Sequence, residues 1–138
     1  MEIRIIPMSM DDPEFVGKTI EQVQNDFFMD SLPNKENGWY YYARVGLDAK
    51  SGDLLLFQMQ NQIIATAVLD MVLKFGRPTD EGNHGTYVLY KDTIKTFKPI
   101  SVEELKKYIK GFESFNQSKP RYSKDDVILE ELEKRINE

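Results

Sequence analysis

GDLLLFQMQNQIIATAVLDMVLKF, residues 52–75, is the stretch of sequence that decides the fold. The run DLLLFQMQ has the apolar and aromatic content of a β-strand, and QIIATAVLDMVLKF gives a second, longer strand. Asn61-Gln62 between them allows a tight hairpin, although Asn-Gly would be the stronger turn signal. The second run is long enough to bend or to carry a β-bulge. The stretch therefore predicts a pair of antiparallel strands.

Further strand-like runs lie on both sides of this hairpin. They are EIRII (2–6), GWYYYARV (38–45) and TYVLYKDTIKTFKPI (86–100), the last giving one or two strands. Several β-branched and aromatic runs at short spacing, with few helices between them, favour an antiparallel barrel or curled sheet. The sequence thus predicts an α+β fold, in which a small, mostly antiparallel, curled or closed β-barrel is flanked by helices.

Helices are expected at three places. Asp11-Asp12-Pro13 gives a helix start, and apolar residues at helical spacing follow, which predicts an N-terminal helical insertion over about residues 12–30. Ser101-Val102-Glu103-Glu104 is a capping box before LKKYI, and Gly111 closes that helix. A last helix is expected over about residues 125–137. The runs DSLPNKENG and FESFNQSKPRYSK read as irregular connections.

Composition limits the protein class. A chain of 138 residues, 41% hydrophobic and 30% charged, suits one globular domain spanning residues 1–138. It contains no cysteine, which excludes disulfides, thiolate zinc sites and cysteine nucleophiles, and fits a cytoplasmic protein. MEIRIIPMSMDD lacks the features of a signal peptide, and no apolar run of about 18 residues could cross a membrane. The oligomeric state stays open between a monomer and a weak dimer.

Charge is unevenly distributed. The net charge of −5 argues against a protein that coats nucleic acid by electrostatics alone. Residues 1–60 hold ten acidic and five basic side chains, whereas residues 101–124 hold six basic and three acidic ones. The latter segment is either a solvated helix face or a local binding patch.

Enzyme signatures are missing: the sequence has no GxGxxG, P-loop, GxSxG or HExxH motif, and no PD-x-E-x-K arrangement. Its one histidine, His84, cannot form a multi-histidine metal site, and a structural or ligand-contacting role is open for it. The acidic pairs Asp11-Asp12 and Asp80-Glu81 read best as capping or solubility groups. We therefore expect a protein without catalysis, cofactor or metal.

The run of four aromatics in residues 39–42 is the first candidate binding site. Alternation along a strand puts Trp39 and Tyr41 on one face, and Tyr40, Tyr42 and Arg44 on the other. One face must be core, and the other could stack on a flat base. We expect Trp39, Tyr40 and Tyr42 to stack, with Arg44 as donor. If the Trp39 face is the open one, Trp39 and Tyr41 take this role and Arg44 loses it. In the purely structural alternative, the tyrosines are good strand formers covered by a helix.

A second candidate is FNQSKPRY, residues 115–122. Lys119 and Arg121 are expected to hold phosphates, together with the lysines at 106, 107 and 110. Phe112 and Phe115 read instead as side chains that pin this connection to the core.

These residues resemble a known superfamily. An aromatic strand, a turn and then GDLLLFQMQNQIIATAVLDMVLKF look like the core of PUA-like proteins, which include PUA, ASCH, EVE, YTH and SRA-type domains. The block YVLYKDTIKTFKPISVEELKKYIKGFESFNQSKPRY resembles the PUA/EVE-like modules found beside HNH-type nucleases in bacterial modification-dependent restriction systems. The resemblance covers about residues 38–124, and residues 8–37 have no counterpart in it.

This resemblance implies a curled or closed barrel that binds RNA, or DNA with a modified or flipped base in an aromatic pocket. The function expected from the sequence is thus non-catalytic nucleic-acid binding. Two alternatives stay open. One is a protein-interaction module that uses the acidic N-terminal half and the aromatic face. The other is a small ASCH-type enzyme, for which Lys50, Asp53 and Lys74 are loose candidates.

Overall fold

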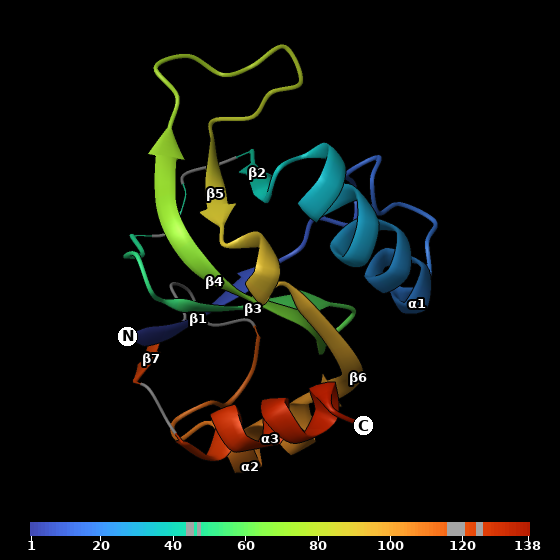
Figure 1. Ribbon diagram of the computed structural model, residues 1–138, viewed down its shortest axis with the longest axis vertical. Helices are drawn as coiled ribbons and strands as arrows, with labels where there is room; N and C mark the ends of the chain where they lie inside the picture. The colour runs from blue at the N-terminus through green and yellow to red at the C-terminus, as the bar shows by residue number, and fades with distance from the viewer. Residues whose placement is uncertain (44–45, 47, 116–120, 124–125) are drawn as a thin grey trace.

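The computed structural model describes residues 1–43, 46, 48–115, 121–123 and 126–138 (Figure 1). Within this part the fold is α+β, with a mostly antiparallel sheet of seven strands. The strands are β1 (Glu2–Pro7), β2 (Trp39–Tyr42), β3 (Leu54–Met59), β4 (Gln62–Lys74), β5 (Gly85–Leu89), β6 (Lys95–Ser101) and β7 (Arg121–Ser123). The helices are α1 (Ile20–Gln22), which continues into the π-helix η1 (Val23–Lys35), then α2 (Val102–Tyr108) and α3 (Asp126–Ile136), with a 3-10 turn η2 (Lys91–Thr93).

The predicted hairpin is confirmed as the antiparallel pair β3–β4, and the structure places it at the centre of the sheet. Its turn is Gln60-Asn61, one residue earlier than expected, and both residues have positive φ, 52° and 60°. Two such residues in a row are typical of the tight turn whose twist matches that of the strands. The predicted irregularity of the long strand is also confirmed, because the register of β4 shifts between Ile63 and Ala65 and between Leu69 and Met71.

Because of these shifts, the two halves of β4 pair with different strands. Its first half pairs with β3 and β6, and its second half pairs with β5, which in turn pairs with β2. The strand order is β2-β5-β4-β3-β1-β7, with β6 paired to β4. The described strands do not close into a ring, so the sheet is curled and open at β2 and β7 rather than a closed barrel.

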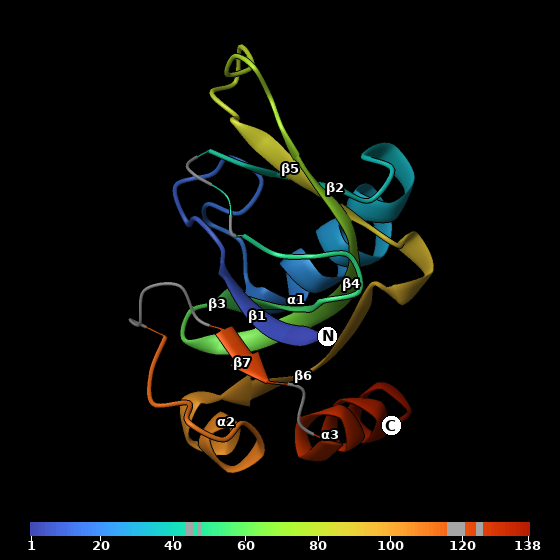
Figure 2. The ribbon, with the colours of Figure 1, turned by 90° about the vertical axis from the view of Figure 1, so that its left-hand side faces the viewer.

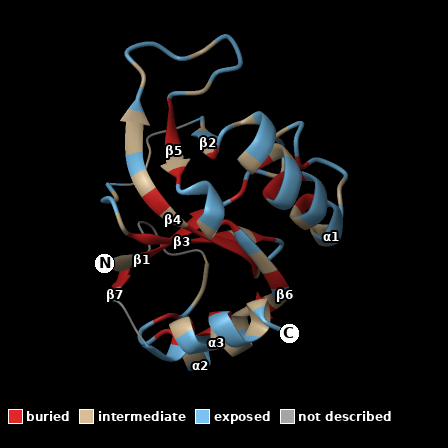
Figure 3. Cartoon of the chain, viewed as in Figure 1, coloured by how far each residue is buried: buried red, intermediate tan, exposed pale blue. Residues whose placement is uncertain are grey.

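Helices cover the two faces of the β3–β4 region (Figures 1 and 2). Leu55 and Phe57 of β3 pack into a core beneath α1 and η1, whereas Leu54 and Leu56 pack into a second core against α2 and α3. Both faces of β3 are thus buried, as the red strands of Figure 3 show. This burial explains why LLLF is continuously apolar instead of alternating.

The N-terminal helix is shifted from its expected place. It begins at Ile20, after the capping box formed by Thr19 and Gln22, and extends to Lys35 through much of the run expected as a loop. Asp11-Asp12-Pro13 starts only a turn. Gly17, with a φ of 73°, separates that turn from the helix. In contrast, the capping box at Ser101 and Glu104 is confirmed at the start of α2.

Two pairings of the first strand were not expected. β1 runs parallel to β3, which is the parallel exception in the sheet. Part of the segment expected to be irregular forms β7, which is antiparallel to β1. The pinning role of the phenylalanines is confirmed, because Phe112 is buried and its ring centroid lies 5.1 Å from that of Phe115.

Candidate binding pocket beside β2

The faces of β2 differ in burial as the alternation predicts. Tyr40 is only 7% exposed, and its ring packs in the core beneath α1 and η1, which we call the upper core. The centroid of its ring lies 4.9 Å from that of Phe57 and 5.9 Å from that of Phe27. Tyr41 is 38% exposed and lies 6.2 Å, between ring centroids, from the half-buried Trp39. The open face of this strand is therefore the one with Trp39 and Tyr41.

Tyr42, which we expected to stack on a ligand, is engaged inside the protein. Its hydroxyl donates to the carbonyl oxygen of Leu73 at 3.3 Å, and its ring lies 5.0 Å from that of Tyr87. The same side chain fills the space above Gly85, where an added Cβ would come within 2.0 Å of the Tyr42 hydroxyl. The aromatic rings that β2 leaves open are therefore those of Trp39 and Tyr41.

A cavity of about 670 Å³ lies beside β2. It is formed by the segment after β1, by η1 and the residue that follows it, by β2, and by the β4–β5 loop. In Figure 1, β2 is seen between β5 and η1, with that loop above it. Its lining consists of residues 12–15, 27, 36, 39–41, 79, 81 and 83.

The lining carries negative charge. Asp12, Glu14, Glu36 and Glu81 are among its residues, and none of the described lining residues is basic. None of these four carboxylates forms an ion pair with another residue of the described part. Four acidic groups that share one cavity without a counter-charge favour a positively charged occupant.

The two tyrosines of the pocket are affected by these carboxylates. Burial, Asp12 and the neighbouring Tyr87 raise the pKa of Tyr40. Burial, Glu36 and Glu81 raise the pKa of Tyr41, and all three residues line the same cavity. Both hydroxyls therefore stay protonated and neutral throughout the physiological range.

Tyr40 also leaves a hydrogen-bonding group unused. Its hydroxyl has no hydrogen-bond partner among the described residues, although its side chain is almost fully buried and lines the cavity. This hydroxyl can donate to, or accept from, a group bound in the pocket.

Local hydrogen bonds hold the acidic residues in place. Asp12 caps its turn, because its carboxylate accepts from the Glu14 N–H at 2.8 Å. Glu36 ends η1, with its N–H donating to Ser31 and its C=O accepting from Trp39. The β4–β5 loop is tied around Glu81 by hydrogen bonds between residues 79 and 83 in both directions.

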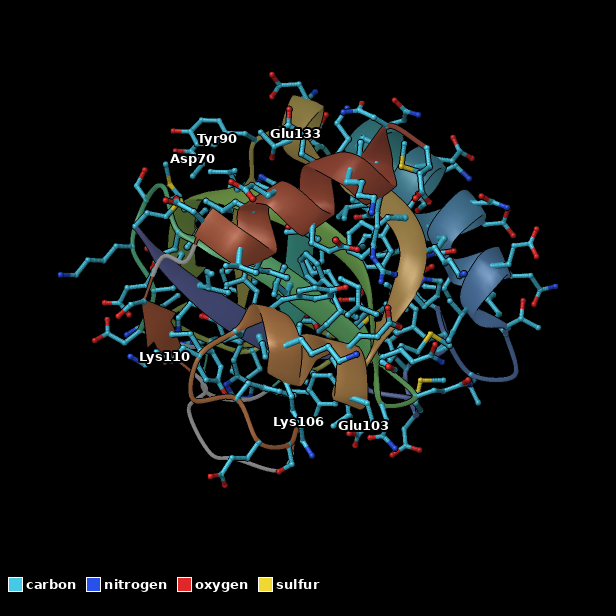
Figure 4. The ribbon with its side chains drawn as sticks, turned by 90° about the horizontal axis from the view of Figure 1, so that it is seen from below. Asp70, Tyr90, Glu103, Lys106, Lys110 and Glu133 are labelled. Atoms are coloured by element: carbon cyan, nitrogen blue, oxygen red, sulfur yellow. The ribbon has the colours of Figure 1, made fainter. Side chains whose placement is uncertain are left out.

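The expected phosphate-binding residues do not border this pocket in the described part of the chain. Arg44 and Lys119 lie outside the described residues, and Arg121 enters only as a backbone position of β7 paired with Arg4. Lys106 of α2 and Lys110 just after it lie at the end of the molecule away from β2, at the periphery in Figure 4. The lysines of and just after α2 are thus on a different surface from the aromatic strand.

Some of the residues considered for metal binding or enzyme chemistry can be located in the described part of the chain. They contain no group of three or more metal-ligating side chains. His84 is exposed, and its N–H donates to Tyr42 O at the base of the β4–β5 loop. Asp53, one of the loose enzyme candidates, accepts from the backbone N–H groups of Glu2 and Lys50, which is a structural role. No described helix has the length and apolar character to span a membrane.

Comparisons with known proteins found no match among protein-family models, curated proteins or solved structures. The PUA-like resemblance therefore stays a prediction.

The carboxylates of the pocket were missed in the sequence because they converge from separate elements. The usable signals were the acid excess of residues 1–60 and the acidic pairs 11–12 and 80–81, which were interpreted as caps and solubility groups.

Proposed function

We propose that this protein is a non-catalytic binding domain that takes a positively charged group of a protein partner into the pocket beside β2. The observation that carries this proposal is the combination of the half-buried Trp39 ring and the exposed Tyr41 ring with four carboxylates that form no ion pair, all lining one cavity. A cation over a Trp or Tyr ring gains about 0.5–2 kcal/mol, and adjacent carboxylates add charge-assisted hydrogen bonds. This is the interaction-module alternative of the sequence, with a specific contact surface.

Nucleobase recognition is the second candidate. The rings of Trp39 and Tyr41 on the open face of β2 favour it, because a base can stack on them while carboxylates accept hydrogen bonds from its amino groups. The acidic lining opposes it, because phosphates carry the same sign of charge. Phosphate contacts would have to come from Lys119 and Arg121, which lie outside the described residues and the described side chains, respectively.

We also propose a fold family for this protein. We place the protein among PUA-like domains, with the curled sheet as an open form of their barrel. The support is the hairpin that follows Gly52-Asp53 and the aromatic strand that precedes it. An intracellular place of action in the cytoplasm is part of the proposal, supported by the absence of cysteine from the sequence.

Trp39 is the single tryptophan of the chain, so its fluorescence reports directly on the pocket. The test is a titration at low salt with N-acetyl-arginine amide, a lysine-rich peptide, a glutamate-rich peptide and a single-stranded oligonucleotide. We expect the two cationic probes to change the fluorescence, with affinity that falls as salt rises. The glutamate-rich peptide should have no effect.

A pair of double variants provides the control. Glu36→Gln with Glu81→Gln removes two charges from the pocket, whereas Glu130→Gln with Glu133→Gln removes two from α3 at the other end of the molecule. Only the pocket variant should lose affinity for the cationic probes. Binding of the oligonucleotide alone, with the cationic probes inert, would support nucleobase recognition instead. Equal losses in both variants would contradict a cation site in this pocket.

A further inference from the structure

The cavity runs along the free edge of β2. Trp39, Tyr40 and Tyr41 are consecutive, and all three line it. Consecutive side chains of a strand point to opposite faces, so a cavity that touches all three must lie beside the strand rather than over one face. β2 is the last strand of its side of the sheet, and in the described part it pairs only with β5. This edge is thus a place where another strand can add.

The backbone of β2 directs N–H and C=O groups toward its free edge, as such an addition requires. Leu89 N–H donates to Gly38 C=O at 2.8 Å, and His84 N–H donates to Tyr42 C=O at 2.9 Å, so the even-numbered positions face β5. In an antiparallel pair the hydrogen-bonded positions alternate, which turns the N–H and C=O of Tyr41 and the C=O of Trp39 toward the cavity. The N–H of Trp39 is already bound by Glu36 C=O at 2.9 Å.

The side chains around this edge define the chemistry of the partner. Glu36 at the end of η1 and Glu81 on the β4–β5 loop line the same cavity as Tyr41. A guanidinium group is planar, stacks on aromatic rings and offers five donors that can be divided among several acceptors. The Tyr40 hydroxyl also lines the cavity, but from the opposite face of β2, so it is available to another polar group of the partner. An ammonium group fits the charge but not the stacking geometry.

We infer that the edge of β2 binds an extended, arginine-bearing segment of a partner protein, which adds as a strand and places its guanidinium between the Trp39–Tyr41 rings and the carboxylates. This inference rests on the proposed function and adds to it the conformation of the partner and the identity of its cation. Strand addition of this kind draws affinity from main-chain hydrogen bonds and specificity from side-chain pockets. Edge-to-edge pairing of two copies of this chain is opposed, because it would bring two acidic pockets together.

The test uses the full chain and an acetylated, amidated heptapeptide of sequence TVTRTVT, with Trp39 fluorescence for affinity and hydrogen exchange of the Tyr41 amide for pairing. We expect the peptide to protect the Tyr41 amide. Replacing its arginine by citrulline, which keeps the shape but removes the charge, should weaken binding on the order of tenfold, and lysine should weaken it less.

N-methylation separates strand addition from simple cation binding. Methylating the peptide nitrogens of one alternate set should weaken binding strongly, whereas methylating the other set should not, because only one set faces β2. If both sets are tolerated while N-acetyl-arginine amide still binds, the strand inference is wrong and the proposed function stands. If neither the amide nor the heptapeptide binds, both fail.

Two further outcomes would overturn the inference. One is an oligonucleotide that binds more tightly than the heptapeptide and protects the same amide. The other is protection of the Tyr41 amide that rises with protein concentration without peptide, which would indicate a dimer through β2. Glu81→Gln should weaken peptide binding and Glu133→Gln should not, with unchanged thermal midpoints showing that both variants are folded.

Discussion

Gly85 makes room for the Tyr42 side chain where β2 pairs with β5. Gly85 pairs with Tyr42 in the register, and an added Cβ there would lie 2.0 Å from the Tyr42 hydroxyl and 2.4 Å from Leu73 O. Neither neighbour can move freely, since the hydroxyl is bound to that same carbonyl. The position of the Tyr42 ring therefore depends on the absence of a side chain at residue 85.

We expect Gly85→Ala to destabilise the protein by about 1–3 kcal/mol, the usual cost of overpacking a closed site. Gly76→Ala is the matched control, because an added Cβ at residue 76 meets nothing within 4 Å. Urea unfolding of the two variants measures the difference. Equal free energies of unfolding would show that Tyr42 can vacate its place without cost.

At the scale of elements, Arg135 joins α3 to α2 and β6. Arg135 donates to the carbonyl oxygens of Lys98 at 2.8 Å and Pro99 at 3.1 Å in β6, and pairs with Glu131 of its own helix. It also pairs with Glu104 of α2. Arg135 thus holds two helices and a strand together, and Glu104 serves two elements because it also closes the capping box of α2.

This cluster predicts an acid sensitivity. Burial opposes the effect, but hydrogen bonds from Arg135 and Ser101 lower the pKa of Glu104 below its ordinary value of 4.5. A lowered folded-state pKa contributes stability above the unfolded value, and this stability is lost as the pH falls through the folded value. We expect Glu104→Gln to lower the thermal midpoint at pH 7 and to approach the parent protein in acid.

Thermal unfolding from pH 7 to about pH 3 measures the convergence. Glu103→Gln is the control, because Glu103 is an exposed carboxylate on the same helix, 3.5 Å from Lys106. Its midpoint should stay near that of the parent at every pH. A constant offset between Glu104→Gln and the parent would mean that the ionised pair contributes no stability.

Local patterns predicted the elements whose signals are local. The hairpin, the capping box of α2 and the alternation of residues 39–42 each depend on neighbours within a few positions. The N-terminal helix was misplaced because Asp11-Asp12-Pro13 and Thr19-x-x-Gln22 are both start signals, and Gly17 decides between them. β7 was missed because its partner is β1, at the other end of the chain. The pocket was half predicted for the same reason: its rings are local to β2, whereas its carboxylates come from distant segments.

At the scale of the whole molecule, two cores share one pair of strands. The upper core holds η1 and Tyr40, and the lower core holds α2 and α3. β3 and β4 send side chains into both. A structure of this kind unfolds as one cooperative unit, because neither core can lose its sheet while the other keeps it.

This coupling can be tested with a change far from its reporter. Leu105 is fully buried in the lower core, and Leu105→Ala should cost about 2–5 kcal/mol. We expect the unfolding midpoint seen by Trp39 fluorescence, at the upper end of the molecule, to fall together with the midpoint seen by far-ultraviolet circular dichroism. Val16→Ala, at a residue that is 57% exposed, should leave both midpoints in place. A Trp39 transition that stays at the parent midpoint while the circular dichroism midpoint shifts would mean that the two cores unfold separately. The strands that they share, β3 and β4, would then not couple their unfolding.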